Sequence, residues 1–113
     1  MLHIALHFIV PAIVAVAIDR DRWLGIWFVL VATMLVDVDH LIADPIYDPN
    51  RCSIGFHPLH SAPAIVAYAA MFVGPVALRR MRARREDGMM RVVTLTGLGL
   101  LIHMALDGID CWI

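Results

Sequence analysis

Residues 36–61 read VDVDHLIADPIYDPNRCSIGFHPLHS, and this stretch is unusually polar for the chain that contains it. It holds four of the ten acidic residues and three of the six histidines, whereas 61% of the whole chain is hydrophobic. Ionisable side chains are costly in a membrane and mostly serve a purpose where they occur. We therefore expect these carboxylates and imidazoles to act together at one site.

The surrounding composition is that of a membrane protein. The chain has 113 residues, which suits one domain, and its mean hydropathy of +0.79 is far above that of a soluble globular protein. The first residues, MLHIALHFIVPAIVAVAI, are apolar but lack a basic n-region and an A-x-A cleavage site. We read them as a first membrane span rather than a signal peptide.

Working outward from the polar stretch, the apolar segments predict an all-α fold, a polytopic bundle of four transmembrane helices in a single domain. The expected helices are residues 3–18, 23–43, 61–78 and 92–112, joined after the second by a polar loop, 44–60, and after the third by a basic loop, 79–91. Pro45, Pro49 and Gly55 act as helix breakers within the polar loop. Pro11 is expected to kink the first helix, which neighbouring helices tolerate in a membrane.

The arginines predict the orientation of this bundle. Eight of the nine basic residues lie at 19–22 and 79–91, on one face of a four-span arrangement, and only Arg51 lies on the other. By the positive-inside rule the arginine-rich face is cytoplasmic. Both termini and the 44–60 loop then face the periplasm or exterior of a bacterial inner membrane. We read the basic run as this topology signal and not as a nucleic-acid site.

The expected depth of the ionisable groups agrees between segments. A helix rises about 1.5 Å per residue, so the histidines and aspartates of all four helices should lie roughly 18–28 Å from the cytoplasmic charges, in the direction of the outer face. The hydrocarbon core is about 30 Å thick. The groups should therefore meet in the outer half of the membrane.

The spacing of these residues also places them in pairs. Residues three or four apart share a helix face, and three pairs have this spacing: His3 with His7, Asp37 with His40, and His103 with Asp107. His57 and His60 lie together just before the third helix. A helical bundle with inward His and Asp side chains is a known way of building a metal site.

Neutral imidazole and carboxylate are ligands for Zn²⁺, Fe and Mn²⁺, and we expect two or three divalent ions, zinc in preference to iron or manganese. The candidate ligands are His3, His7, Asp37, Asp39, His40, His57, His60, His103 and Asp107. Asp39, Asp107 and Arg51 are candidate catalytic residues. A carboxylate can bridge two ions, orient a histidine or act as a general base, and an outward arginine can bind a phosphate or carboxylate.

Each of these features also has a purely structural interpretation. The first two histidines can be interfacial residues, Asp37 and Asp39 can cap a helix, and Arg51 can be a plain surface charge. Cys52 and Cys111 both fall on the outward face, where disulfides are permitted. They form either a bridge between the polar loop and the last helix or two free thiols.

Three motifs carry a resemblance to a known family: ATMLVDVDHLIADPIYDPNRCSIGFHPLHS, LH near the start, and HMALDGIDC near the end. The chain resembles a family of small uncharacterised bacterial membrane proteins that is similar to predicted membrane-bound metal-dependent hydrolases, over nearly its whole length. The resemblance implies that the DxDH, the paired histidines and the later HxxxD are metal ligands. Here these are Asp37, Asp39, His40, His57, His60, His103 and Asp107.

The function expected from these observations is metal-dependent hydrolysis of a lipid or lipid-linked ester, foremost a phosphoester, near the outer leaflet. The expected partners are the lipid bilayer and an amphiphilic small molecule, without nucleic acid, and four short helices leave surface for a homo-oligomer. Two alternatives remain: a di-iron membrane oxygenase or hydroxylase, and a non-enzymatic metal- or haem-binding protein. Oxygen-dependent activity would indicate the first, and a Soret band a haem carrier.

Overall fold

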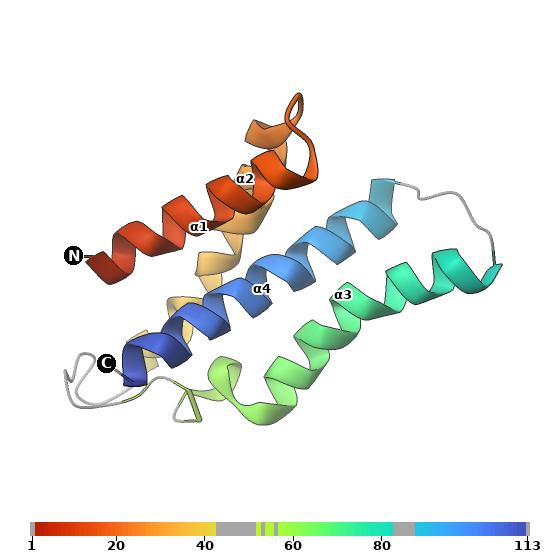
Figure 1. Cartoon of the computed structure of the whole chain (residues 1–113). Coiled ribbons are helices and arrows are strands. Elements are labelled where there is room, and N and C mark those ends of the chain that lie inside the picture. Colours follow the sequence, from red (N-terminus) through yellow and green to blue (C-terminus); the bar gives the residue numbers. More distant parts are fainter. Residues whose placement is uncertain (1, 43–51, 53, 56, 83–87, 113) are drawn as a thin grey trace.

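The structure is a computed structural model, and it is all-α across the residues it describes (Figure 1). It describes residues 2–42, 52, 54, 55, 57–82 and 88–112, with the side chains of His40, Arg82 and Trp112 left out. In chain order the elements are α1 (Leu2–Ile18), α2 (Trp23–Ala32), the 3₁₀-helix η1 (Thr33–Ile42), the short 3₁₀-helix η2 (Pro58–His60), α3 (Ala62–Arg82) and α4 (Gly88–Trp112).

Helix α4 is the central element of the fold. It runs between α1 and α3 in Figure 1 and also packs against α2 and η1. One apolar cluster joins α1, α2 and α4 through Ala15, Leu30 and Leu95. A second cluster lies nearer the C-terminal end of α4 and includes Tyr68 and Met104. Both halves of the core therefore depend on the same helix.

Two glycines let neighbouring helices approach α4 closely. A Cβ added at Gly97 would lie 2.7 Å from the backbone nitrogen of Phe72 in α3. A Cβ added at Gly99 would lie 2.7 Å from Thr33 Cγ2 and 3.0 Å from the carbonyl oxygen of Leu30, at the junction of α2 with η1. Small residues at such crossings are typical of helix packing in membranes.

Several expected boundaries are corrected by the structure. The helix expected at 23–43 is α-helical only to Ala32 and continues as 3₁₀-helix to Ile42. At this junction the Thr33 hydroxyl donates a hydrogen bond to the Leu30 carbonyl, a back-bond that competes with regular helix bonding. The polar loop expected at 44–60 contains the 3₁₀-turn Pro58–His60, which begins with proline.

The expected basic loop, 79–91, is shorter than its charges suggest. Helix α3 continues to Arg82, and α4 already begins at Gly88. Arginine has high helix propensity, so a run of arginines can extend a helix beyond its apolar part. Among the described helices, α3 and α4 are long and apolar enough to cross a membrane, through Ala62–Met81 and Gly88–Cys111. Helix α1 is apolar but shorter.

The chain ends and the arginine-rich segments lie at opposite ends of the molecule. In Figure 1 the N- and C-terminal ends lie together, while the α1–α2 turn and the start of α4 lie at the far end. Many large apolar side chains on α1 and α3 face outward, including Ile4, Ile13, Val66 and Val73. Such surfaces mark contact with a membrane or with another protein.

Candidate metal centre

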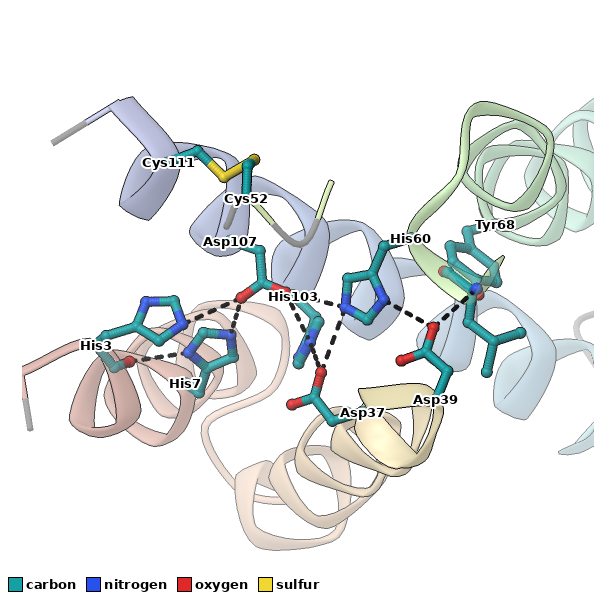
Figure 2. A network of polar contacts seen from close by, with 11 residues as sticks. His3, His7, Asp37, Asp39, Cys52, His60, Tyr68, His103, Asp107 and Cys111 are labelled. Atoms are coloured by element: carbon teal, nitrogen blue, oxygen red, sulfur yellow. Dashed lines mark hydrogen bonds and ion pairs between the residues drawn. A yellow bond between two sulfur atoms is a disulfide. The ribbon is translucent and has the colours of Figure 1, made fainter. Parts of the chain in front are cut away.

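The end of the molecule that holds both termini contains a dense cluster of histidines and aspartates. Figure 2 shows them converging from separate segments: His3 and His7 from α1, Asp37 and Asp39 from η1, His60 from η2, and His103 and Asp107 from α4. Most of these side chains are buried, and the described residues include two groups that can hold a metal ion.

The first group consists of Asp37, His60, His103 and Asp107, whose potential ligand atoms all lie within 4.8 Å of one another. His60 Nε2 lies 3.0 Å from Asp107 Oδ2 and 3.3 Å from Asp37 Oδ1. His103 Nε2 lies 2.9 Å from Asp37 Oδ1 and 3.3 Å from Asp107 Oδ2. Two imidazole nitrogens thus face two carboxylate oxygens around one point.

The second group consists of His3, His7 and Asp107. Asp107 Oδ1 lies 3.1 Å from His3 Nε2 and 3.2 Å from His7 Nε2. The i, i+4 spacing of the two histidines places both rings on the face of α1 that meets α4, with their centroids 4.4 Å apart. Asp107 therefore belongs to both groups, with Oδ2 in the first and Oδ1 in the second (Figure 2).

The second nitrogen of two histidines has a partner of its own. His7 Nδ1 lies 2.9 Å from the carbonyl oxygen of His3, and His60 Nδ1 lies 3.1 Å from Asp39 Oδ2. These acceptors require a proton on Nδ1, so in a neutral ring Nε2 has only a lone pair. That lone pair points at a carboxylate of Asp107, an arrangement that needs a proton or a cation between the two atoms.

Asp39 lies behind His60 and outside both groups. Its Oδ2 accepts hydrogen bonds from His60 Nδ1 and from the backbone N–H of Leu59, at 3.1 and 2.9 Å. The Tyr68 hydroxyl donates to the carbonyl of Leu59 at 2.8 Å. A carboxylate on the far nitrogen of a ligating histidine fixes its tautomer and orientation. Asp39 is thus placed to orient His60, which is a different role from binding the metal ion directly.

The charge state of His60 follows from its carboxylate neighbours. Burial acts to lower the pKa of His60. Hydrogen bonds with Asp107, Asp37 and Asp39 together outweigh this effect and raise the pKa to about 10. In the metal-free site the ring is therefore a cation at neutral pH. A metal ion bound at Nε2 would take the place of this proton.

With this geometry described, the chain can be compared with known proteins. Residues 1–82 match the family of unknown function DUF6122. The chain belongs to DUF6122. The matched part of this DUF6122 chain contains the histidines of α1 and the DxDH and HPLH motifs, whereas His103 and Asp107 lie beyond it. No curated protein and no solved structure matches the chain.

Some residues expected at the site lie outside the described part of this DUF6122 chain. They are the side chain of His40 and the whole of Arg51. His57 is described and buried, with its ring centroid 5.7 Å from that of His60, but it belongs to neither group. Its place is beside the centre, next to the ring that Asp39 orients.

Two residues outside the predicted ligand set also lie at the DUF6122 site, and of these only Tyr68 was wholly unexpected from the sequence. One is Tyr68, whose hydroxyl supports the turn that carries His60; its only sequence signal is a polar tip within an apolar helix. The other is Asp110, whose Oδ1 lies 3.6 Å from His3 Nδ1. Its position three residues after Asp107 puts it on the same side of α4.

Cys52 and Cys111 form a disulfide, the first of the two states that the sequence allowed. The bridge joins the polar segment before η2 to the last turn of α4, four residues after Asp107 (Figure 2). It covalently ties two of the segments that supply the cluster.

Proposed function

We propose that this chain is a membrane-embedded, metal-dependent hydrolase that cleaves a lipid or lipid-linked ester, foremost a phosphoester. The observation that supports this most is the position of Asp107, which turns one oxygen to each of two histidine groups. A carboxylate shared in this way is typical of centres with two ions, and two-ion centres commonly serve hydrolysis of phosphoesters.

The donor set fits such ions by type and by distance. Ligands bound tetrahedrally at the usual zinc distances of about 2.0–2.2 Å lie roughly 3.3 Å from one another. The nitrogen–oxygen separations around Asp107 range from 3.0 to 3.3 Å. Histidine and aspartate favour Zn²⁺, with Fe or Mn²⁺ as the next choices.

The protein residues would act as follows. Metal ions held by the two groups around Asp107 would supply a hydroxide from water at neutral pH and would polarise a phosphoryl oxygen. His60 and His7 present Nε2 because Asp39 and the His3 carbonyl hold their Nδ1 protons. Asp37, whose side chain is 40% exposed beside His103, would supply a carboxylate donor to the ion of the first group.

The expected membrane position supports an amphiphilic substrate. Helix α1 of 17 residues would span about 25 Å at 1.5 Å per residue. Helices α2 and η1, 10 residues each, would together span about 35 Å, at 1.5 and about 2.0 Å per residue. With α3 and α4 there would be four spans, and the arginine-rich end would face the cytoplasm. The centre would then lie at the outer leaflet, and Arg51, which lies outside the described residues, stays the residue proposed to bind a head group.

The test is to measure metal content and hydrolysis together. The chain is purified in detergent and its metals are determined by elemental analysis, and release of phosphate or a phosphorylated head group from lipid is then followed. We expect bound zinc or a similar ion and chelator-sensitive hydrolysis, both reduced in His103→Ala. The matched control, Asp21→Asn, changes an exposed carboxylate near the arginine-rich end and should leave both unchanged.

The outcome also separates the other functions. Bound iron with oxygen-dependent activity would replace hydrolysis with oxygenation, and a Soret band would indicate haem. Metal loading that stays the same in His103→Ala would contradict the proposed centre itself.

A further inference from the structure

We propose that the ions bound by the two ligand groups have different roles. The ion held by Asp37, His60, His103 and Asp107 is fully coordinated by the protein, whereas the ion held by His3, His7 and Asp107 has an open coordination position that binds the substrate oxygen. This inference rests on the metal centre of the proposed function. It goes further by assigning the substrate-binding position to one end of the cluster, on α1.

The number of donors distinguishes the two groups. Asp37, His60, His103 and Asp107 offer four ligand atoms, which is a full set for a tetrahedral ion. Among the residues that the structure describes, His3, His7 and Asp107 offer three. Closed sites with four protein ligands are typically structural, whereas catalytic zinc has three protein ligands and a water or substrate in the fourth position.

Access to solvent differs between His3 of the second group and the histidines of the first, whereas His7 is buried like them. The His60 and His103 side chains of the first group are 0% and 2% exposed. In the second group the His3 side chain is 33% exposed, and the neighbouring Asp110 is 62% exposed. A ligand arriving from outside therefore reaches the second group beside His3. Asp37 of the first group is 40% exposed, so exposure alone does not separate the two groups. The first group differs because four donors leave a tetrahedral ion no open position.

The second group also contains a buried donor atom that points into it. His7 is 4% exposed, and within the described part of the chain its Nε2 has no hydrogen-bond partner, although it lies 3.2 Å from Asp107 Oδ1. Because Nδ1 of the same ring faces the His3 carbonyl, Nε2 is available as a metal ligand. Either a proton or a bound cation must lie between this nitrogen and Asp107, and the proposal assigns a cation to that place.

The chemistry of the open position favours a small anionic oxygen ligand. An ion with two neutral imidazoles and a carboxylate shared with another ion keeps net positive charge. A phosphoryl oxygen completes such a set. Asp110, 3.6 Å from His3 Nδ1, is placed to hold the orientation of His3 on the exposed side, as a positioning residue.

The experiment uses Co²⁺, whose visible spectrum reports its coordination, and azide as the anionic probe. The detergent-solubilised full chain is stripped with a chelator and loaded with Co²⁺. We expect two Co²⁺ per chain and a spectral change on adding azide. His7→Ala should bind one Co²⁺ and give no change with azide. His3→Ala, at a partly exposed position, tests the same point with less risk to folding.

Asp21→Asn, at an exposed position on the turn between α1 and α2, is the control, and it should keep both bound Co²⁺ ions and the azide response. Binding of a single Co²⁺ by the unaltered chain would overturn the inference. So would an azide response that persists at full size in both His3→Ala and His7→Ala. If these spectra behave as expected but no ester is hydrolysed, the open position stands and the hydrolase proposal fails.

Discussion

At the scale of single residues, Asp107 determines how the cluster is organised. Its side chain is only 7% exposed and contacts four histidines, two through each oxygen. A buried charge without partners is strongly destabilising. The carboxylate and the surrounding imidazoles therefore need one another, and a metal ion or proton must balance the lone pairs that face it.

The first prediction concerns this shared carboxylate. Asp107→Asn keeps the shape of the side chain but replaces one oxygen with an NH₂ group and removes the charge. One group then loses its Asp107 donor, and the other keeps only a neutral amide oxygen, which is a weaker ligand. We expect metal loading of both groups to fall, whereas His7→Ala should affect one. Elemental analysis beside Asp21→Asn measures this. Two ions retained in Asp107→Asn would exclude the bridging role.

The second prediction follows from the raised pKa of His60. At neutral pH the metal-free ring holds a proton, because its pKa of about 10 lies above the pH. Metal binding must release that proton, so affinity should increase as the pH rises from 6 toward 10. Calorimetry in buffers of different ionisation enthalpy counts the released protons. Removing His60 by His60→Ala should lower the count by about one, and an unchanged count would contradict the assignment.

The third prediction separates Asp39 from the ligands. Because Asp39 contacts Nδ1 of His60 and the backbone of Leu59, Asp39→Asn should weaken metal affinity by about 10–100-fold without changing the number of ions bound. Metal titration gives both quantities. A lost ion in Asp39→Asn would instead make Asp39 a direct ligand.

The sequence could predict much of this centre but not its internal order. The i, i+4 spacings of His3 with His7 and of His103 with Asp107 follow from helix geometry, and both pairs do share a face. Which oxygen of Asp107 meets which ring depends on how α1 and α4 cross. The contact of Asp39 with His60 joins residues 21 positions apart, and no local pattern shows it.

At the scale of elements, η1 explains how the DxD motif works. In a 3₁₀-helix with about three residues per turn, side chains two apart point about 120° from each other. Asp37 and Asp39 therefore lie on neighbouring faces, where one contacts Nε2 and the other Nδ1 of the same His60 ring. The sequence predicted a regular α-helix here because its apolar pattern does not distinguish the two helix types.

The fourth prediction tests the close packing of α3 on α4. An added methyl group at Gly97 would lie 2.7 Å from a backbone atom of Phe72, which a flexible side chain cannot relieve. We expect Gly97→Ala to destabilise the fold by about 1–3 kcal/mol, measured by unfolding in detergent. The control is Gly25→Ala, where nothing lies within 4 Å. Equal stability of the two variants would contradict this packing.

At the scale of the whole molecule, the ionisable cluster and the described arginines of α3, α4 and the α1–α2 turn occupy opposite ends. The all-α class and the grouping of His and Asp could be predicted because hydropathy and spacing depend on neighbouring residues. The extension of α3 into the arginine run could not, since positive charge suggested a loop while helix propensity favoured a helix. The disulfide adds a covalent tie at the cluster end.

The fifth prediction concerns orientation in the membrane. If the arginine-rich end is cytoplasmic, a cysteine introduced by Arg80→Cys, at an exposed position on α3, should react with a membrane-impermeant maleimide in inverted vesicles but not in intact spheroplasts. Cys111, once released from Cys52 by an added reductant, should react in spheroplasts. The opposite pattern would place the metal centre at the cytoplasmic leaflet, and the same site would then meet substrates of the other face. The ligand geometry would stay the same in that case, because contacts within the chain hold the cluster together. Only the side of the membrane from which the site receives its substrate would change.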